Sequence, residues 1–204
     1  MELVPTQENV IDLLRDTGGL RDGHFEFPNG LHAPQYVQVA LTMRSYSAAK
    51  ILSVGLSRLV RAHTEIRAMI PELSIVAPAT GGLPVAYGMC EGLRAKQVYW
   101  GERARTGPMR LRQFLEVKKG EKVLLVDDIL RSGQSVKELQ DVVEERGAVV
   151  VGLAVLLHEP TAGAQTFNGI PFFSLARIEP AYRIAYECQE CKKGVPLEKI
   201  WTRE

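Results

Sequence analysis

The strongest hydrophobic pattern in the chain is a short, unbroken apolar run at residues 123–126. A run of this length without polar positions is typical of a strand that is buried on both faces of a parallel sheet. An amphipathic helical pattern follows and ends at Gly147, and a second apolar run at 149–157 predicts another strand. The order strand, loop, helix, strand predicts a right-handed crossover between two parallel strands.

The rest of the chain continues this alternation of helical and extended patterns. Apolar periodicity predicts helices near 6–20 and 45–60, strands at 74–77 and 97–100, and a hairpin that turns at Asn29-Gly30. The pattern indicates an α/β fold with a central, mostly parallel sheet that is flanked by helices. A length of 204 residues favours one domain over the whole chain, 1–204.

Composition gives no sign of a nucleic-acid or membrane partner. The formal net charge is +1 and the isoelectric point is near 7.7. The sequence lacks an apolar stretch of membrane-spanning length, its start does not resemble a signal peptide, and three cysteines are too few for a disulfide framework. We therefore expect a cytoplasmic protein.

Candidate chemistry follows directly after the central strand. Two adjacent carboxylates, Asp127 and Asp128, precede a turn of small residues at 132–135 that opens the helix. Main-chain N–H groups at a helix start, together with the serine hydroxyls of this turn, can bind a phosphate dianion, and Gly133 allows close approach. The carboxylates suit neutral hydroxyl groups, which donate strong hydrogen bonds to them. A ligand with a phosphate and a nearby diol is a ribose 5-phosphate.

This segment resembles the signature of type I phosphoribosyltransferases, in which an apolar strand and two acids precede Ser/Thr-Gly-x-Ser/Thr. The resemblance implies that the turn binds the 5′-phosphate, and the acids the ribose hydroxyls, of phosphoribosyl pyrophosphate. It also implies a small hood formed by residues of about 1–40 and 160–204 over a core of about 41–159. The binding residues implied here are Asp127, Asp128, Arg131, Ser132, Gly133, Gln134 and Ser135.

Both ends of the chain resemble orotate phosphoribosyltransferases in particular. The hairpin carries Gly-His-Phe at 23–25 and His32, and the tail carries Cys188-x-x-Cys191 followed by Gly-Val-Pro-Leu at 194–197. The resemblance implies a homodimer and places His32 near the base or the pyrophosphate, whereas we expect His24 to be a packing residue. The Cys-x-x-Cys pair is half of a zinc site, and neither a second such pair nor a histidine pair stands at a useful spacing in the sequence. A dimer could supply the other half, and a redox role is a further alternative; we predict no metal site within the chain.

Two more segments resemble parts of the family's site for pyrophosphate. The turn after the predicted strand at 74–77 contains Thr80, Gly81 and Gly82. The resemblance implies that this loop receives the pyrophosphate. The segment 101–112 is rich in arginine and is either a solvated hairpin or a lid that closes on a polyanion. Arg103 and Arg112 stand where the family has basic residues, usually lysines, and arginine is a poor proton donor.

Glu159 is the largest departure from the family pattern. Orotate-using relatives have an arginine there that binds the pyrimidine ring, and a glutamate cannot donate to the carbonyls of a base. We predict transfer of phosphoribosyl from phosphoribosyl pyrophosphate to a pyrimidine base such as orotate. Asp127, Asp128 and Arg103 would be catalytic, His32 and Glu159 would contact the base, and Mg²⁺ would screen the pyrophosphate. The alternatives are a different base, or a non-catalytic regulator that binds the sugar pyrophosphate or a nucleotide.

Overall fold

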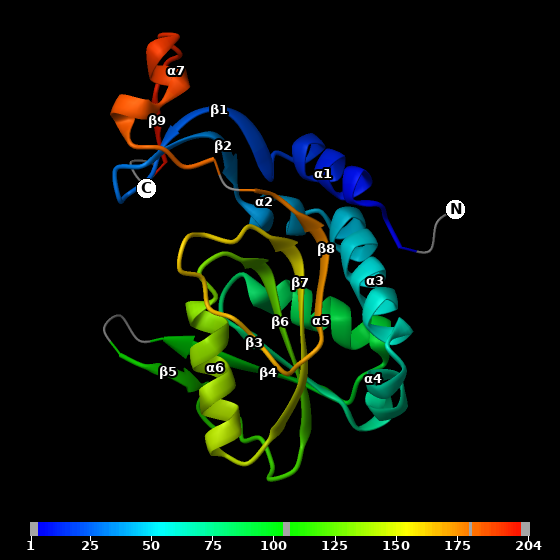
Figure 1. Cartoon of the computed structure of the whole chain (residues 1–204). Coiled ribbons are helices and arrows are strands. Elements are labelled where there is room, and N and C mark those ends of the chain that lie inside the picture. Colours follow the sequence, from blue (N-terminus) through cyan, green and yellow to red (C-terminus); the bar gives the residue numbers. More distant parts are fainter. Residues whose placement is uncertain (1–3, 104–106, 180, 201–204) are drawn as a thin grey trace.

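The core of the protein is a six-stranded sheet, shown by a computed structural model that describes residues 4–103, 107–179 and 181–200. The strand order is β5-β4-β3-β6-β7-β8, and all neighbours are parallel except β5, which pairs antiparallel with β4 (Figure 1). The strands are β3 (Ser74–Pro78), β4 (Gln97–Arg103), β5 (Met109–Leu111), β6 (Lys122–Leu130), β7 (Val149–His158) and β8 (Phe172–Arg177).

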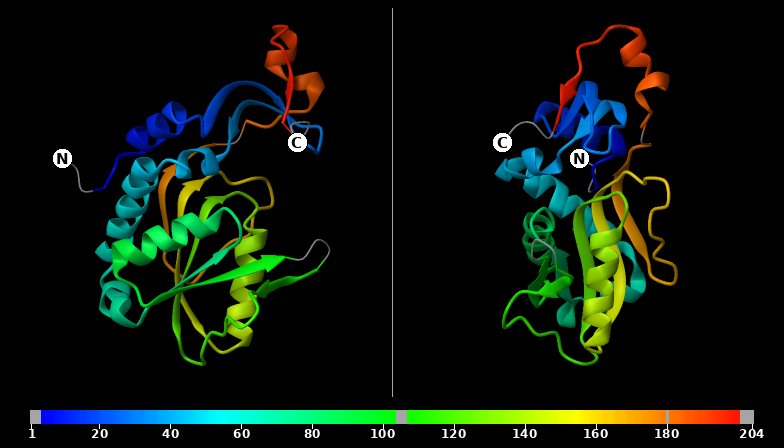
Figure 2. Two further views of the ribbon diagram at one scale, coloured as in Figure 1. Left: turned by 180° about the vertical axis from the view of Figure 1, so that it is seen from behind. Right: turned by 90° about the vertical axis from the view of Figure 1, so that its left-hand side faces the viewer.

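Helices cover both faces of this sheet (Figure 2). α6 (Gln134–Glu145) packs on one face, and α3 (Tyr46–Ala62) and α5 (Gly82–Leu93) pack on the other. Successive residues of β6 point to alternate faces, so Leu124 joins the hydrophobic cluster under α3 and α5, and Leu125 joins the one under α6. Each face of the central strand is therefore buried, as the apolar run predicts.

The hood is a second, smaller sheet over the carboxyl ends of the core strands (Figures 1 and 2). Its order is β2-β1-β9, in which β1 (Leu20–Glu26) and β2 (His32–Val37) form the expected hairpin and β9 (Glu198–Lys199) pairs parallel with β1. Both ends of the chain thus contribute to one sheet. The remaining elements are α1 (Gln7–Asp16), α2 (Val39–Met43), α4 (Thr64–Met69), η1 (Ile70–Glu72), η2 (Ala185–Glu187) and α7 (Gln189–Lys192).

The structure corrects two boundaries. β8 pairs with β7 in the core sheet, so the core continues beyond residue 159 and the C-terminal part of the hood begins only after Arg177. The central strand does not stop at residue 126 but runs to Leu130, so both acids lie on the strand itself. Among the described helices, none has the length and apolar character needed to cross a membrane.

The buried position of Leu125 generates a stability prediction. Leu125→Ala removes a side chain that is fully enclosed between β6 and α6, and the cavity left there should destabilise the fold by about 2–5 kcal/mol. Val149→Ala, at an exposed position of the neighbouring strand, should cost less than about 1 kcal/mol. Urea unfolding followed by circular dichroism measures both, and equal losses would contradict the burial of β6.

Candidate functional site

The two acids occupy fixed positions on the last third of β6. The Asp128 N–H donates to Oδ1 of Asp127 at 2.9 Å, and the Ile129 N–H donates to Oδ1 of Asp128 at 2.8 Å. Asp127 is only 9% exposed, and Asp128 is partly buried beside it. These main-chain bonds orient both carboxylates while their remaining oxygen atoms keep the capacity to accept bonds from a ligand.

Burial sets the electrostatics of this pair. The pKa of Asp127 is raised well above its usual value, first by burial and then by the neighbouring charge of Asp128. Burial also raises the pKa of Asp128, although hydrogen bonds and the charge of Arg131 act in the opposite direction. Two adjacent carboxylates are costly to ionise at such a position. Hydroxyl donors or a cation from a ligand would relieve this cost.

The turn after β6 forms a small cavity beside Asp127, the first of the two acids. Gly133 adopts a left-handed conformation with φ of 72°, and the helix α6 begins at the next residue. The main-chain amides of a first helical turn have no acceptor within the helix, so they can bind an anion. A cavity of about 150 Å³ lies here, lined by Asp127, Ile129, Leu130, Arg131, Ser132, Gly133, Gln134, Ser135 and Val136.

A glycine loop from β3 lies directly against the acid pair. A Cβ atom added to Gly81 would stand 2.7 Å from Oδ2 of Asp128, and one added to Gly82 would stand 3.0 Å from Oδ1 of Asp127. Neither position therefore accepts a side chain without movement of the carboxylates. The structure thus brings the loop that contains Thr80, which is exposed, to the same edge of the sheet as the acids and the anion-binding turn.

Glu159 is held in a buried hydrogen-bond network rather than directed at open space. The Arg131 Nε donates to its Oε2 at 2.6 Å, and the Tyr182 hydroxyl donates to its Oε1 at 3.2 Å. Burial and the Glu159 charge raise the pKa of Tyr182 to about 12. Glu159 is only 6% exposed, so its immediate role is to position Arg131, whose Nη2 also donates to the Val37 carbonyl at 2.9 Å.

Sequence reasoning missed this network, although a signal exists. Leu130 of β6 is the register partner of His158 of β7, so the residues that follow each of them, Arg131 and Glu159, are neighbours across two parallel strands. Once the two strands are placed side by side, opposite charges at matched positions predict an ion pair.

The two arginines of the predicted lid do not line the anion-binding turn of their own chain. Arg103, at the end of β4, forms an ion pair with Glu138 on α6. Arg112, just after β5, forms one with Glu102 at 2.6 Å. Neither lines the cavity at the start of α6, and residues 104–106 of the predicted lid lie outside the described residues. Their contact with phosphoribosyl pyrophosphate stays a prediction.

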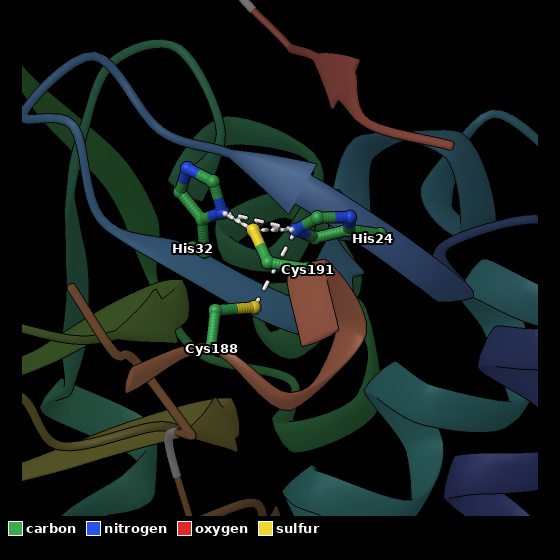
Figure 3. Close-up of side chains that lie close together, drawn as sticks. All are labelled: His24, His32, Cys188 and Cys191. Atoms are coloured by element: carbon green, nitrogen blue, oxygen red, sulfur yellow. Dashed lines mark hydrogen bonds between the residues drawn. The ribbon is translucent and has the colours of Figure 1, made fainter. Parts of the chain in front are cut away.

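His32 lies among other side chains with metal-binding atoms, and its contact with the base stays a prediction. It is 5% exposed, and its Nδ1 lies 2.9 Å from Nε2 of His24 and 3.3 Å from Sγ of Cys191 (Figure 3). The expectation that the chain offers no second ligand pair near Cys188 and Cys191 is therefore wrong. The fold brings together a hairpin and a tail that are more than 150 positions apart, which no sequence spacing reveals.

The buried acid pair generates a pH prediction. An unfolded aspartate titrates near 3.8, so above this pH the native chain, with its raised pKa, holds more protons than the unfolded chain and loses stability as pH rises. Asp127→Asn cannot ionise, so it should flatten this loss and raise the thermal midpoint at pH 7 by about 2–4 °C. Thermal unfolding between pH 4 and 8 measures this, with the exposed Asp141→Asn as control. If the thermal midpoint of Asp127→Asn followed that of the wild type at every pH, the raised pKa of Asp127 would be contradicted.

Comparisons with known proteins agree with this architecture. The sequence profile of the phosphoribosyl transferase domain matches residues 60–192. Orotate phosphoribosyltransferase of Carboxydothermus hydrogenoformans is 33% identical over 96% of this chain and 98% of its own length, and that of Thermotoga maritima is 32% identical over 95% and 98%. The crystal structure of the Aeropyrum pernix enzyme of that name superposes with a TM-score of 0.67 at 20% identity, over 83% of this chain and 93% of that one. The chain therefore belongs to the phosphoribosyltransferase family.

Proposed function

We propose that this protein is an orotate phosphoribosyltransferase, which converts orotate and phosphoribosyl pyrophosphate into orotidine monophosphate and pyrophosphate in pyrimidine biosynthesis. The observation that carries the proposal is the buried acid pair on β6 directly before the anion-binding start of α6. Relatives that match nearly the whole chain have orotate phosphoribosyltransferase as their name. This likeness supports the choice of orotate among the possible bases.

The geometry suggests how the chain's own residues would act. Amides and hydroxyls at Ser132–Ser135 hold the 5′-phosphate, which places the ribose hydroxyls at Asp127 and Asp128. The bond from carbon 1 to the pyrophosphate oxygen breaks, a ring nitrogen of the base bonds to carbon 1, and the base loses the proton of that nitrogen. Positive charge that develops on the ribose is stabilised by the nearby carboxylates, and the glycine loop at Gly81 receives the departing pyrophosphate.

The donor set fits Mg²⁺, which is part of the proposal. Mg²⁺ prefers oxygen ligands and is usually held by one or two carboxylates together with phosphate oxygens of the substrate. Asp127 and Asp128 would hold it, and because burial raises the pKa of both carboxyl groups, a bound cation would favour their ionised forms. When bound, the ion neutralises charge on the pyrophosphate leaving group.

The network at Glu159 explains how orotate can be accepted despite a glutamate at this position. The positive charge of Arg131 offsets the negative charge of Glu159, so the pair does not repel a carboxylate on the base. Among the described residues, Nη1 of Arg131 has no hydrogen-bond partner, which leaves donors for a carbonyl or carboxylate. A pocket of about 670 Å³ adjoins the network and is lined by Phe27, Asn29, Leu31, Thr161, Ala162 and Tyr182. We propose that the base binds there.

We also propose a cytoplasmic homodimer in which the hairpin of β4 and β5 serves the partner's site. Arg103 and Arg112 lie on the described part of this hairpin, are partly exposed, and do not line the anion-binding cavity of their own chain. Two large aromatic side chains, Tyr46 and Tyr87, are exposed beside an apolar groove between α3 and α5 and offer a surface for a second copy.

The identity of the base is tested directly by pyrophosphate release. Purified protein, Mg²⁺ and phosphoribosyl pyrophosphate are incubated with orotate, uracil, adenine and hypoxanthine in turn. Release with orotate alone is the expected result, since Arg131 offers donors to its carboxylate and carbonyls. Asp128→Asn should reduce turnover by about 100-fold or more, whereas Asp141→Asn on the exposed face of α6 should not.

Each of the other outcomes selects one alternative. Release only with adenine or hypoxanthine would show that the substrate is another base than orotate. An adenine phosphoribosyltransferase shares this fold, with a TM-score of 0.58 at 16% identity. Tight binding of phosphoribosyl pyrophosphate without any release would make the protein a regulator. Light scattering on the same samples tests the dimer, which requires twice the chain mass of 22.6 kDa.

The role of Glu159 is tested separately. Glu159→Gln places an amide N–H₂ or a neutral oxygen against Arg131 Nε, so the guanidinium loses its ion pair and its fixed orientation. We expect the KM for the base to rise about 10-fold or more, while the KM for phosphoribosyl pyrophosphate changes less than about 3-fold. Steady-state kinetics with each substrate varied in turn measures both, and equal increases would contradict a role in base binding.

A further inference from the structure

Four side chains with metal-binding atoms meet in the hood (Figure 3). His24 and His32 come from the β1–β2 hairpin, and Cys188 and Cys191 come from the tail around α7. One potential ligand atom of each residue lies within 4.8 Å of all the others. This cluster lies apart from the acid pair and plays no part in the reaction proposed above.

The spacing of these atoms fits a tetrahedral zinc ion. Zinc bonds of about 2.0–2.1 Å to nitrogen and 2.3 Å to sulfur place tetrahedral ligands about 3.3–3.8 Å apart. The Nε2 of His24 lies 3.4 Å from Sγ of Cys188 and 3.5 Å from Sγ of Cys191, and Nδ1 of His32 lies 3.3 Å from Sγ of Cys191. The two ring nitrogens are slightly closer, at 2.9 Å. An ion would need to part them by only a few tenths of an ångström.

A hydrogen bond to a residue outside the cluster orients the ring of His24. Nδ1 of His24 lies 2.8 Å from the Val195 carbonyl oxygen, which can only accept, so the ring proton is on Nδ1. The lone pair of Nε2 is then directed at the centre of the cluster. Metal-bound histidines are commonly oriented by such a bond from their other ring nitrogen to a carbonyl oxygen.

We propose that His24, His32, Cys188 and Cys191 bind one Zn²⁺ ion in a closed, structural site. Two thiolates and two imidazoles in tetrahedral spacing select zinc over the hard cations Mg²⁺ and Ca²⁺, which prefer oxygen. Four protein ligands leave no position open for water or substrate, which is the mark of a structural rather than a catalytic site.

Apart from the cluster, the tail is joined to the hairpin mainly by main-chain hydrogen bonds and by polar contacts near the surface. Within the described tail, 181–200, Cys188 is the one buried residue, at 1% exposure. The strand β9 has two residues, and although the ion pair that joins Arg21 to Glu198 is bidentate, the two side chains are 38% and 28% exposed, so water screens their attraction. A zinc ion would therefore supply much of the free energy that fixes the tail to the hairpin.

The metal content of the full-length protein tests the proposal. Protein purified without a histidine tag or chelator should carry about one zinc per chain by inductively coupled plasma mass spectrometry. Cys188→Ser and Cys191→Ser should each reduce this to less than about 0.2. Cys90→Ser is the matched control, because Cys90 lies on α5 and its thiol donates to the Ala95 carbonyl instead. It should keep the full content.

Cobalt substitution provides a readout that does not depend on whether variants fold. Wild-type protein depleted of zinc and titrated with Co²⁺ should show thiolate-to-cobalt charge-transfer bands and the visible bands of tetrahedral cobalt, saturating at one equivalent. Depletion should also lower the thermal midpoint by about 5 °C or more, and added Zn²⁺ should restore it.

Three results would overturn the site. One is zinc content below about 0.1 per wild-type chain after loading with Zn²⁺ and desalting under reducing conditions. Another is a cobalt titration without thiolate bands. The third is equal zinc content in Cys90→Ser and Cys191→Ser, since the metal would then be bound elsewhere. Because none of these measurements uses enzyme activity, failure of the zinc site and failure of the proposed reaction are distinguishable.

Discussion

Two like charges buried side by side at the end of β6 are the constraint on which the rest of the site depends. Burial opposes their ionisation, and each raises the free energy of the other in the charged state. They are tolerated because the strand beneath them is held by packing on both faces and by parallel neighbours on both edges. The core thus stabilises an arrangement that would be unfavourable on its own and that a ligand with hydroxyl groups relieves.

The surrounding elements are arranged so that each contributes something that the acids lack. The start of α6 offers main-chain amides, the β3 loop offers two glycines that lie against the carboxylates, and the Arg131–Glu159 pair adds a guanidinium whose charge is already compensated. All of them follow the carboxyl ends of adjacent parallel strands, where ligands of such sheets bind. The topology of the sheet therefore determines which elements contribute to the site.

Features that depend on neighbours in the sequence could be predicted from it. The buried strand that contains 123–126, the helix before the stop at Gly147 and the hairpin at Asn29-Gly30 each follow from local periodicity or turn chemistry. The structure confirms all three elements, although the strand continues to Leu130 and the helix ends at Glu145. Features that depend on contacts between distant segments could not. The charge of Glu159 suggested a site hostile to orotate, because its partner Arg131 becomes a neighbour only in the folded sheet. In the sequence the Cys-x-x-Cys pair is only half of a metal site for the same reason, since the two histidines that complete the cluster lie more than 150 positions before it.

The parallel pairing of β9 with β1 joins two segments in the hood that are far apart in the sequence. The core sheet ends at β8, so it can assemble on a nascent chain while the tail is still inside the ribosome. The hood sheet cannot, because its third strand, β9, follows β8 along the chain. A chain interrupted between β8 and β9 would therefore keep its acid pair but lack one strand of the hood above it.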